Sequence, residues 1–300
     1  MEKMNPTALI LIVMANFFWA VAQVVGKKAL NQMGATSFNA IRFSVMIPFI
    51  LLIVYMTQSW KSIPVNGYLL IAILCGVLGL FAGCYLFFYL LKKTAAHLVI
   101  PIGNSQLFWI ILLSGILLGE NITIFLLISA VAIFSGSFII SKKGRPKNPR
   151  NDKNRLDWMI LSAIFVAFLW GLTVVLNKYA LEGGFIYSNL LLIEVVVAAV
   201  LFNFTLVIKG NIRKTYFTKS SPMRRDVRMS VASALFGFLP GSQLYLMALQ
   251  IEKASILAPF FGLTLLFGFL LSVLILAERP SKKAIVGTVL ILASLVLVTF

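Results

Sequence analysis

The segment TAAHLVIPIGNSQLFWIILLSGILLGE, residues 94–120, is an apolar stretch with a proline near its start and an acidic residue at its end. The chain repeats this pattern 158 positions later, where the same residue type recurs in three pairs: Pro101 and Pro259, Ser114 and Ser272, Glu120 and Glu278. Four apolar positions, Ala96, Leu107, Leu112 and Leu113, agree at the same offset. A recurrence of this length indicates one structural unit used twice.

Two further registers support the repeat. At an offset of 151, Trp19 meets Trp170 and Lys27 meets Lys178. At the offset of 158, the G-x-x-x-G pair Gly79 and Gly83 meets Gly237 and Gly241. This glycine spacing allows helices to approach closely in a membrane, and we expect it to serve packing. The nearly constant offset predicts two similar halves.

The composition indicates a membrane protein. Of the 300 residues, 60% are hydrophobic and 12% are charged, against roughly 25% charged in a soluble domain. The apolar runs are continuous and roughly 20 residues long, as membrane-spanning helices require. We therefore predict an all-α polytopic membrane protein and exclude a β-barrel, which needs alternating residues.

Ten transmembrane helices fit the hydropathy pattern. Their predicted ranges are about 7–26, 37–57, 68–91, 95–118, 122–140, 158–180, 185–208, 229–250, 254–277 and 282–300. The first five-helix repeat occupies residues 1–141, a basic cytoplasmic linker occupies residues 142–157, and the second repeat occupies residues 158–300. Because each repeat has an odd number of spans, the two are inverted relative to each other, as in many secondary transporters.

The basic residues predict the orientation. Apart from Arg42, which lies within a span, 21 Lys and Arg residues fall in loops on one face and 4 on the other. The positive-inside rule makes the first face cytoplasmic and places both termini outside the cell membrane. Because the basic residues lie in loops and mark the orientation, the net charge of +17 does not indicate nucleic-acid binding. A short basic cluster such as Arg224-Arg225 is also suited to anionic lipid.

Two charged residues are expected inside the bilayer, where charges are costly and usually functional. Arg42 lies near the cytoplasmic end of the second span, so it extends to the interface, caps a neighbouring helix or contributes to a site. Glu194 lies in the middle of the seventh span. It serves either proton coupling or amine binding. Proton coupling predicts that Glu194→Gln stops gradient-driven transport but preserves exchange, whereas binding predicts the loss of both.

Polar and aromatic residues recur at helical spacing on several spans. Those predicted to line a central substrate cavity, together with the two charged residues, are Trp19, Gln23, Arg42, Asn104, Trp109, Trp170, Asn177, Glu194, Gln243 and Tyr245. Amides in hydrocarbon need partners, so these faces point into the bundle. Pro101 and Pro259 each remove a backbone hydrogen bond and are predicted to act as hinges. Glu120 and Glu278 are expected to favour the N-terminal dipole of the span that follows each of them.

The chain resembles the drug/metabolite transporter (DMT) superfamily, specifically its EamA-type branch. The resemblance depends on Phe18-Trp19-Ala20, Leu169-Trp170-Gly171, Arg42-Phe43, Pro101 through Glu120, and Pro259 through Glu278. It implies ten spans, a central cavity between the repeats and alternating access. It also implies small metabolites such as amino acids as substrates, with ion or proton gradients often driving transport.

The sequence therefore predicts a secondary transporter for a small metabolite, most plausibly an amino-acid-like compound that is exported. A multidrug or toxic-compound exporter and a lipid-carrier flippase are the alternatives. An intramembrane enzyme would need paired acids or a buried nucleophile and base, and the nine acidic residues are scattered. We expect no enzymatic activity, cofactor or metal. The expected partners are the small-molecule substrate, protons as coupling ion, and membrane lipids, around a monomer or homodimer.

Overall fold

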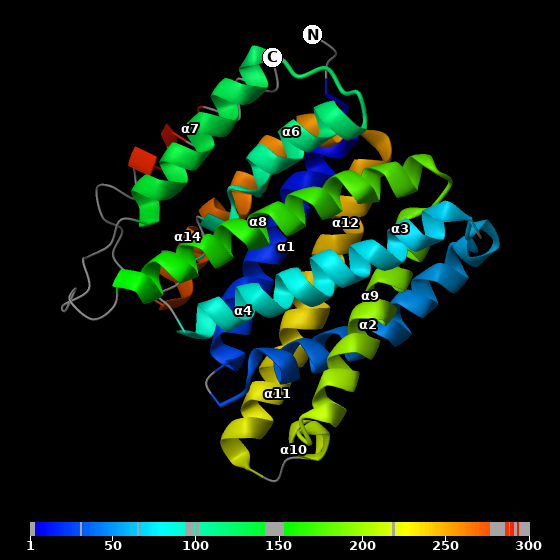
Figure 1. Cartoon of the computed structure of the whole chain (residues 1–300), viewed down its shortest axis with the longest axis vertical. Coiled ribbons are helices and arrows are strands. Elements are labelled where there is room, and N and C mark those ends of the chain that lie inside the picture. The colour runs from blue at the N-terminus through cyan, green and yellow to red at the C-terminus, as the bar shows by residue number, and fades with distance from the viewer. Residues whose placement is uncertain are drawn as a thin grey trace.

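The structure, a computed structural model, describes residues 4–30, 32–64, 66–93, 99, 102–141, 153–217, 220–276 and a few positions between 286 and 293. The described part of the chain is helical (Figure 1). The elements are α1 (Pro6–Ala29), α2 (Ala35–Met56), η1 (Ser59–Ser62), α3 (Gly67–Cys75), η2 (Gly76–Gly83), α4 (Cys84–Lys93), α6 (Gln106–Leu117), α7 (Ile124–Ser141), α8 (Lys153–Glu182), α9 (Tyr187–Ile208), α10 (Ile212–Tyr216), α11 (Ser221–Ser233), η3 (Ala234–Phe238), α12 (Leu239–Ile251), α13 (Ala254–Leu257), η4 (Ala258–Gly262) and α14 (Leu263–Leu276).

Within the described residues, six helical segments are long and apolar enough to cross a membrane. They comprise α1, α2, the run α3–η2–α4, most of α8, α9, and the run α11–η3–α12. Three shorter apolar helices occupy 106–117, 124–136 and 254–268, where three further spans are predicted. The predicted tenth span, 282–300, and most of the linker at 142–157 lie outside the described residues. The structure therefore shows a polytopic helical protein, and the count of ten spans stays a prediction.

Two of the long spans contain a π-helical turn at matching positions. The η2 turn begins at Gly76 and the η3 turn begins at Ala234, which are related by the offset of 158 found in the sequence. Such wide turns are uncommon and often occur at functional sites. The η2 turn contains both glycines of its G-x-x-x-G segment, and the η3 turn contains the first glycine of the other. The glycine-rich sequence therefore changes the local helix geometry as well as the packing.

Helices from the two halves are interleaved. The most extensive contacts join α2 to α9 and α1 to α12. In the other direction, α8 packs against α6 and along the run α3–η2–α4 (Figure 1). The first long helix of each half therefore packs against the third span of the other half. This exchange brings side chains from both halves to a common centre.

Polar contacts between loops and helix ends gather on two opposite faces. On one face, the Asp226 carboxylate accepts hydrogen bonds from the backbone N–H groups of Gln32 at 2.7 Å and Met33 at 3.1 Å. On the other, the Asn189 amide donates to the carbonyl oxygen of Ser59 at 3.0 Å. Successive long helices thus run in alternating directions, as a multi-pass chain requires.

The position of Glu120 differs from the prediction. We expected this residue to favour the start of the following helix, α7. Instead, its two carboxylate oxygens accept hydrogen bonds from the backbone N–H groups of Ala254 at 2.9 Å and Ser255 at 2.8 Å, at the start of α13. The chain turns at Gly119, which has a φ of 66°, and the carboxylate satisfies exposed N–H groups of the opposite half. Glu278 lies outside the described residues.

Candidate functional site

A cavity of about 130 Å³ lies between the two halves. Its walls come from α1, α2, η2, α4, α8, α9, η3, α12, η4 and α14, and from the turn before α6. Eight of the ten residues predicted to bind substrate line this cavity: Trp19, Gln23, Arg42, Asn104, Trp170, Asn177, Glu194 and Tyr245. The structure thus brings the two expected intramembrane charges to one compartment.

The structure does not place the other two predicted residues on the cavity. Trp109 packs edge-on against Phe168 of α8, with ring centroids 5.1 Å apart. Gly171 leaves room for this contact, because a Cβ atom there would lie 2.5 Å from the Cβ of Trp109. Gln243 is buried beside the cavity-lining face of α12, and both polar atoms of its side chain lack a hydrogen-bond partner. Its neighbours Ser242 and Tyr245 occupy the cavity wall.

The predicted hinge at Pro259 coincides with a change of helix type. This proline is buried within η4, a 3-10 turn that separates α13 from α14. Phe261 from the same turn lines the cavity. Asn104, which occupies the turn before α6, lies in the corresponding part of the first half. Pro101 lies outside the described residues.

Arg42 is enclosed by aromatic rings. The side chain is 1% exposed, so it does not extend to the interface. Its guanidinium carbon lies 4.0–5.4 Å from the centroids of four rings, those of Phe38, Phe43, Phe88 and Phe238. The Nη2 atom is 3.5 Å from Sγ of Cys84, and Nε has no hydrogen-bond partner. Cation–π attraction thus holds the guanidinium in place while one of its donors stays unused.

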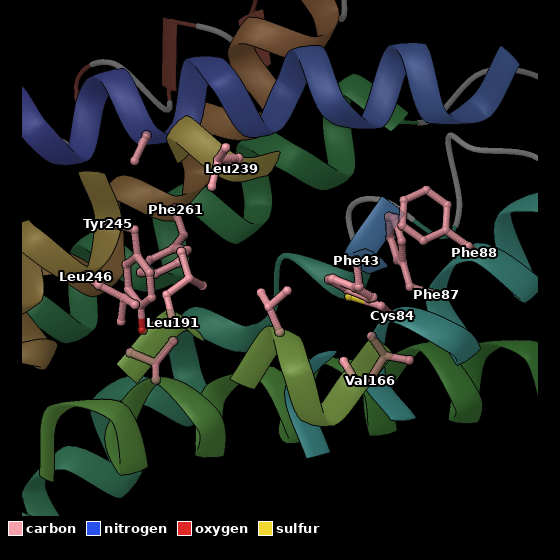
Figure 2. Close-up of a cluster of buried hydrophobic side chains, with 14 of the residues drawn as sticks. Phe43, Cys84, Phe87, Phe88, Val166, Leu191, Leu239, Tyr245, Leu246 and Phe261 are labelled. Atoms are coloured by element: carbon pink, nitrogen blue, oxygen red, sulfur yellow. The ribbon is translucent and has the colours of Figure 1, made fainter. Parts of the chain in front are cut away.

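Glu194 occupies a different part of the same cavity. It is 3% exposed, and its Oε1 atom has no hydrogen-bond partner. Asn177 and Tyr245 are its polar neighbours, and both are also buried. In Figure 2, Tyr245, Leu246, Leu191 and Phe261 gather on one side, away from Phe43, Cys84, Phe87 and Phe88. The cavity therefore has a Glu194 side and an Arg42 side.

Arg42 and Glu194 occupy equivalent positions. Helices α2 and α9 each have 22 residues and begin at positions 35 and 187, so residues 42 and 194 are both eighth in their helices. The sequence offset of 151 pairs Glu194 with Phe43, the residue next to Arg42. In the described structure no ion pair within 4.0 Å joins Arg42 to Glu194, so the two side chains do not neutralise each other.

The glycine pairs support the two cavity tryptophans. A Cβ atom at Gly83 would lie 2.7 Å from the indole nitrogen of Trp170, and one at Gly241 would lie 2.7 Å from Cδ1 of Trp19. The indole N–H of Trp170 donates to the carbonyl oxygen of Gly79 at 3.2 Å. That of Trp19 donates to the hydroxyl of Ser242 at 3.3 Å. The glycines therefore shape the cavity in addition to allowing close packing.

Several wall residues were not among those predicted from the sequence. Most of them belong to pairs at the offset of 158: Leu80 with Phe238, Cys84 with Ser242, Phe88 with Leu246, Gly103 with Phe261, Gln106 with Thr264, and Phe87 with the predicted Tyr245. The repeat contained the signal, because a position that lines a shared cavity in one half does so in the other. Apolar members of these pairs gave no sign of function by themselves.

Residues 6–142 and 157–300 each match the model of the EamA-like transporter family. The chain belongs to this family. An uncharacterized transporter from Archaeoglobus fulgidus is 20% identical to it over 229 residues, which cover 76% of this chain and 75% of that protein. A protein of known crystal structure shares the fold of this EamA-like transporter, with a TM-score of 0.77, 14% identity and 98% of each chain covered. The family and the apolar helices together establish a multi-pass membrane protein with a transport function.

Proposed function

We propose that this EamA-like protein is a secondary transporter that exports a small amino-acid-like metabolite. The observation that carries the proposal is the presence of Arg42 and Glu194 on the wall of one cavity without an ion pair between them. A buried charge without a partner is unfavourable by several kcal/mol, on the order of the desolvation penalty of an ion. A zwitterion supplies both missing partners at once.

The surroundings of each charge suggest how the substrate is oriented. The Arg42 guanidinium has a free Nε donor and donates hydrogen bonds to the substrate carboxylate. The Glu194 carboxylate accepts hydrogen bonds from the amine. Between them, the rings of Trp19 and Trp170 and the amides of Gln23 and Asn104 contact the rest of the molecule. When no substrate is present, a proton on Glu194 neutralises the carboxylate, which makes protons the expected coupling ion.

The matching walls of the cavity support alternating access. Equivalent elements from both halves surround it, so a rocking motion of one repeat against the other exposes it first to one face and then to the other. This mechanism requires the predicted ten helices in two inverted repeats, 1–141 and 158–300, joined by the linker 142–157. Pro259 within η4, and Pro101 at the corresponding place, are the proposed hinges.

We place the protein in the cell membrane with both termini outside, as the distribution of Lys and Arg predicts. In this orientation, the face that carries Asp226 and loop 30–34 is cytoplasmic. Arg42 is the eighth residue of α2 counted from that face, and Glu194 is the eighth residue of α9 counted from the opposite face. The substrate carboxylate then points toward the cytoplasm and the amine toward the outside.

The test is a comparison of metabolites in culture medium from cells that produce the wild type or Glu194→Gln. Glu182→Gln is the matched control, because Glu182 is 55% exposed and pairs only with Lys178 in the described structure. Selective accumulation of a few amino acids or related metabolites with the wild type and the control supports export. Identical media for all three strains would reject it. Accumulation of lipophilic cations without carboxylates would identify a drug exporter, and lipid-dependent competition would identify a flippase.

A further inference from the structure

Three unused hydrogen-bonding atoms meet on the Glu194 side of the cavity. Oε1 of Glu194, Oδ1 of Asn177 and the hydroxyl of Tyr245 are all buried, and none has a hydrogen-bond partner. The three side chains are 3%, 3% and 6% exposed. They come from α9, α8 and α12, and the amide group of Asn177 faces both the Glu194 carboxylate and the Tyr245 hydroxyl, without a hydrogen bond within 3.5 Å to any of the three atoms named. Leaving a buried polar group without a partner is unfavourable, so the cluster has the character of a ligand site.

The fold itself does not require these polar groups. At the equivalent positions of the first half, Asn177 is replaced by Gly26 and Tyr245 by Phe87, at the offsets of 151 and 158. Glu194 is replaced by the oppositely charged Arg42. The same helical framework thus forms in the first half without any of the three acceptors. Their presence in the second half is a property of this side of the cavity.

Aromatic rings complete the surroundings of the cluster. The ring centroids of Trp19 and Tyr245 are 5.2 Å apart, those of Trp19 and Phe261 are 5.7 Å apart, and those of Tyr245 and Phe261 are 5.8 Å apart. All three residues line the cavity, and Figure 2 shows Tyr245 beside Phe261. Ring faces attract cations, so this wall favours a positively charged ligand.

We propose that Glu194, Asn177 and Tyr245 form a subsite for a primary ammonium group, with Trp19 and Phe261 as its aromatic wall. An ammonium has three N–H donors, one for each of the three oxygens. The carboxylate neutralises its charge, and the rings contact its neighbouring carbon atoms. A quaternary ammonium has no N–H and leaves all three oxygens unpartnered. This subsite assigns the amine end of the substrate and rests on the proposed function.

The experiment uses the purified full-length protein and follows its thermal unfolding with small probes. 3-Methylbutylamine carries the primary ammonium, its N,N,N-trimethyl analogue carries only the charge, and 4-methylpentanoate carries only a carboxylate. We expect the primary amine to stabilise the wild type at concentrations roughly tenfold lower than the trimethyl analogue, since hydrogen bonds to buried polar groups are lost in the analogue. Equal stabilisation by both amines, or none by the primary amine, would overturn the proposal.

Tyr245→Phe is the decisive variant because it removes only the hydroxyl and installs the residue that the first half has at Phe87. We expect it to fold normally and to bind 3-methylbutylamine roughly tenfold more weakly. Tyr89→Phe, at a side chain that is 44% exposed, should leave this affinity unchanged. Unchanged amine binding in Tyr245→Phe would contradict the subsite. Stabilisation by Na⁺ that disappears in Tyr245→Phe and Glu194→Gln would replace the ammonium with a metal cation.

The subsite and the proposed function can fail separately. If Tyr245→Phe exports the same metabolites as the wild type with unchanged affinity, the subsite is wrong and the transporter proposal stands. If the amine binds as predicted but the medium of cells with wild-type protein gains no amine-bearing metabolite, amino-acid export is wrong and the subsite stands.

Discussion

Gly76 packs directly against the backbone of Glu194. A Cβ atom built on Gly76 would lie 2.9 Å from the carbonyl oxygen of Glu194 and 3.1 Å from its Cα. Because Gly76 begins the π-helical turn η2, the wide turn and the missing side chain together let this span approach α9 at the level of its charged residue. The glycine-rich segment of the first half therefore positions the carboxylate of the second.

The first prediction concerns this contact. Gly76→Ala forces α9 to move by a few tenths of an ångström and should lower the free energy of unfolding by ~1–3 kcal/mol, as overpacking does. It should also weaken amine binding, because Glu194 moves with the backbone. Gly67→Ala is the control, since a Cβ atom there meets nothing within 4 Å. Thermal unfolding and amine titration measure the two effects. Equal behaviour of the two variants would show that the contact has no role.

The second prediction separates the two ends of the substrate. Arg42→Met keeps an unbranched side chain among the four rings that surround Arg42, and sulfur packs well against aromatic rings. We expect binding of 4-methylpentanoate to weaken by roughly tenfold or more, because a charged hydrogen bond is lost. Binding of 3-methylbutylamine should change little. An equal loss of affinity for both probes would contradict the role of Arg42 as the carboxylate partner.

The third prediction concerns the contact of Glu120 with the start of α13. Glu120→Ala removes the acceptor for two backbone N–H groups, those of Ala254 and Ser255, and should lower the free energy of unfolding by ~1–3 kcal/mol. Glu182→Ala removes the pair between buried Lys178 and the half-exposed Glu182 carboxylate. It should change the free energy of unfolding by less than about 1 kcal/mol, because Lys178 keeps its hydrogen bond to the carbonyl oxygen of Leu249. A thermal shift no larger for Glu120→Ala than for Glu182→Ala would mean that this cap does not stabilise the protein.

The fourth prediction tests the orientation. Lys61 in η1 and Lys214 in α10 are exposed and lie on opposite faces, while the native cysteines Cys75 and Cys84 are buried. A membrane-impermeant thiol reagent should label Lys61→Cys in intact cells and Lys214→Cys only after permeabilisation. The reverse pattern would place the termini in the cytoplasm.

Spacing along single helices predicted a large part of the site. Trp19 and Gln23 on α1, and Trp170 and Asn177 on α8, lie on the cavity wall, because residues one or two turns apart share a helix face. Trp109 is not part of the cavity wall. Helical periodicity defines a face but not its direction relative to neighbouring helices, and Gly171 allows this residue to pack closely against α8.

Contacts between the two halves were beyond the sequence pattern. A carboxylate at the end of an apolar segment favours any nearby helix start, and Glu120 reaches α13 because the turn at Gly119 directs it across the interface. The relation between Arg42 and Glu194 needed the helix boundaries, because a loop length that differs by one residue shifts the register. The aromatic enclosure of Arg42 joins residues of α2, α4 and η3, which are distant in the chain.

By itself, the sequence determined the helical membrane class and the resemblance to the EamA-type branch. In lipid, continuous apolar segments form helices because helices satisfy every backbone hydrogen bond. The repeated positions of glycine, proline and glutamate can be recognised without any knowledge of packing. The tertiary structure alone decided which side chains meet. Burial and hydrogen bonding depend on the rotation and approach of helices from both halves, and these brought one cation, one anion and three unpartnered oxygens to a single cavity.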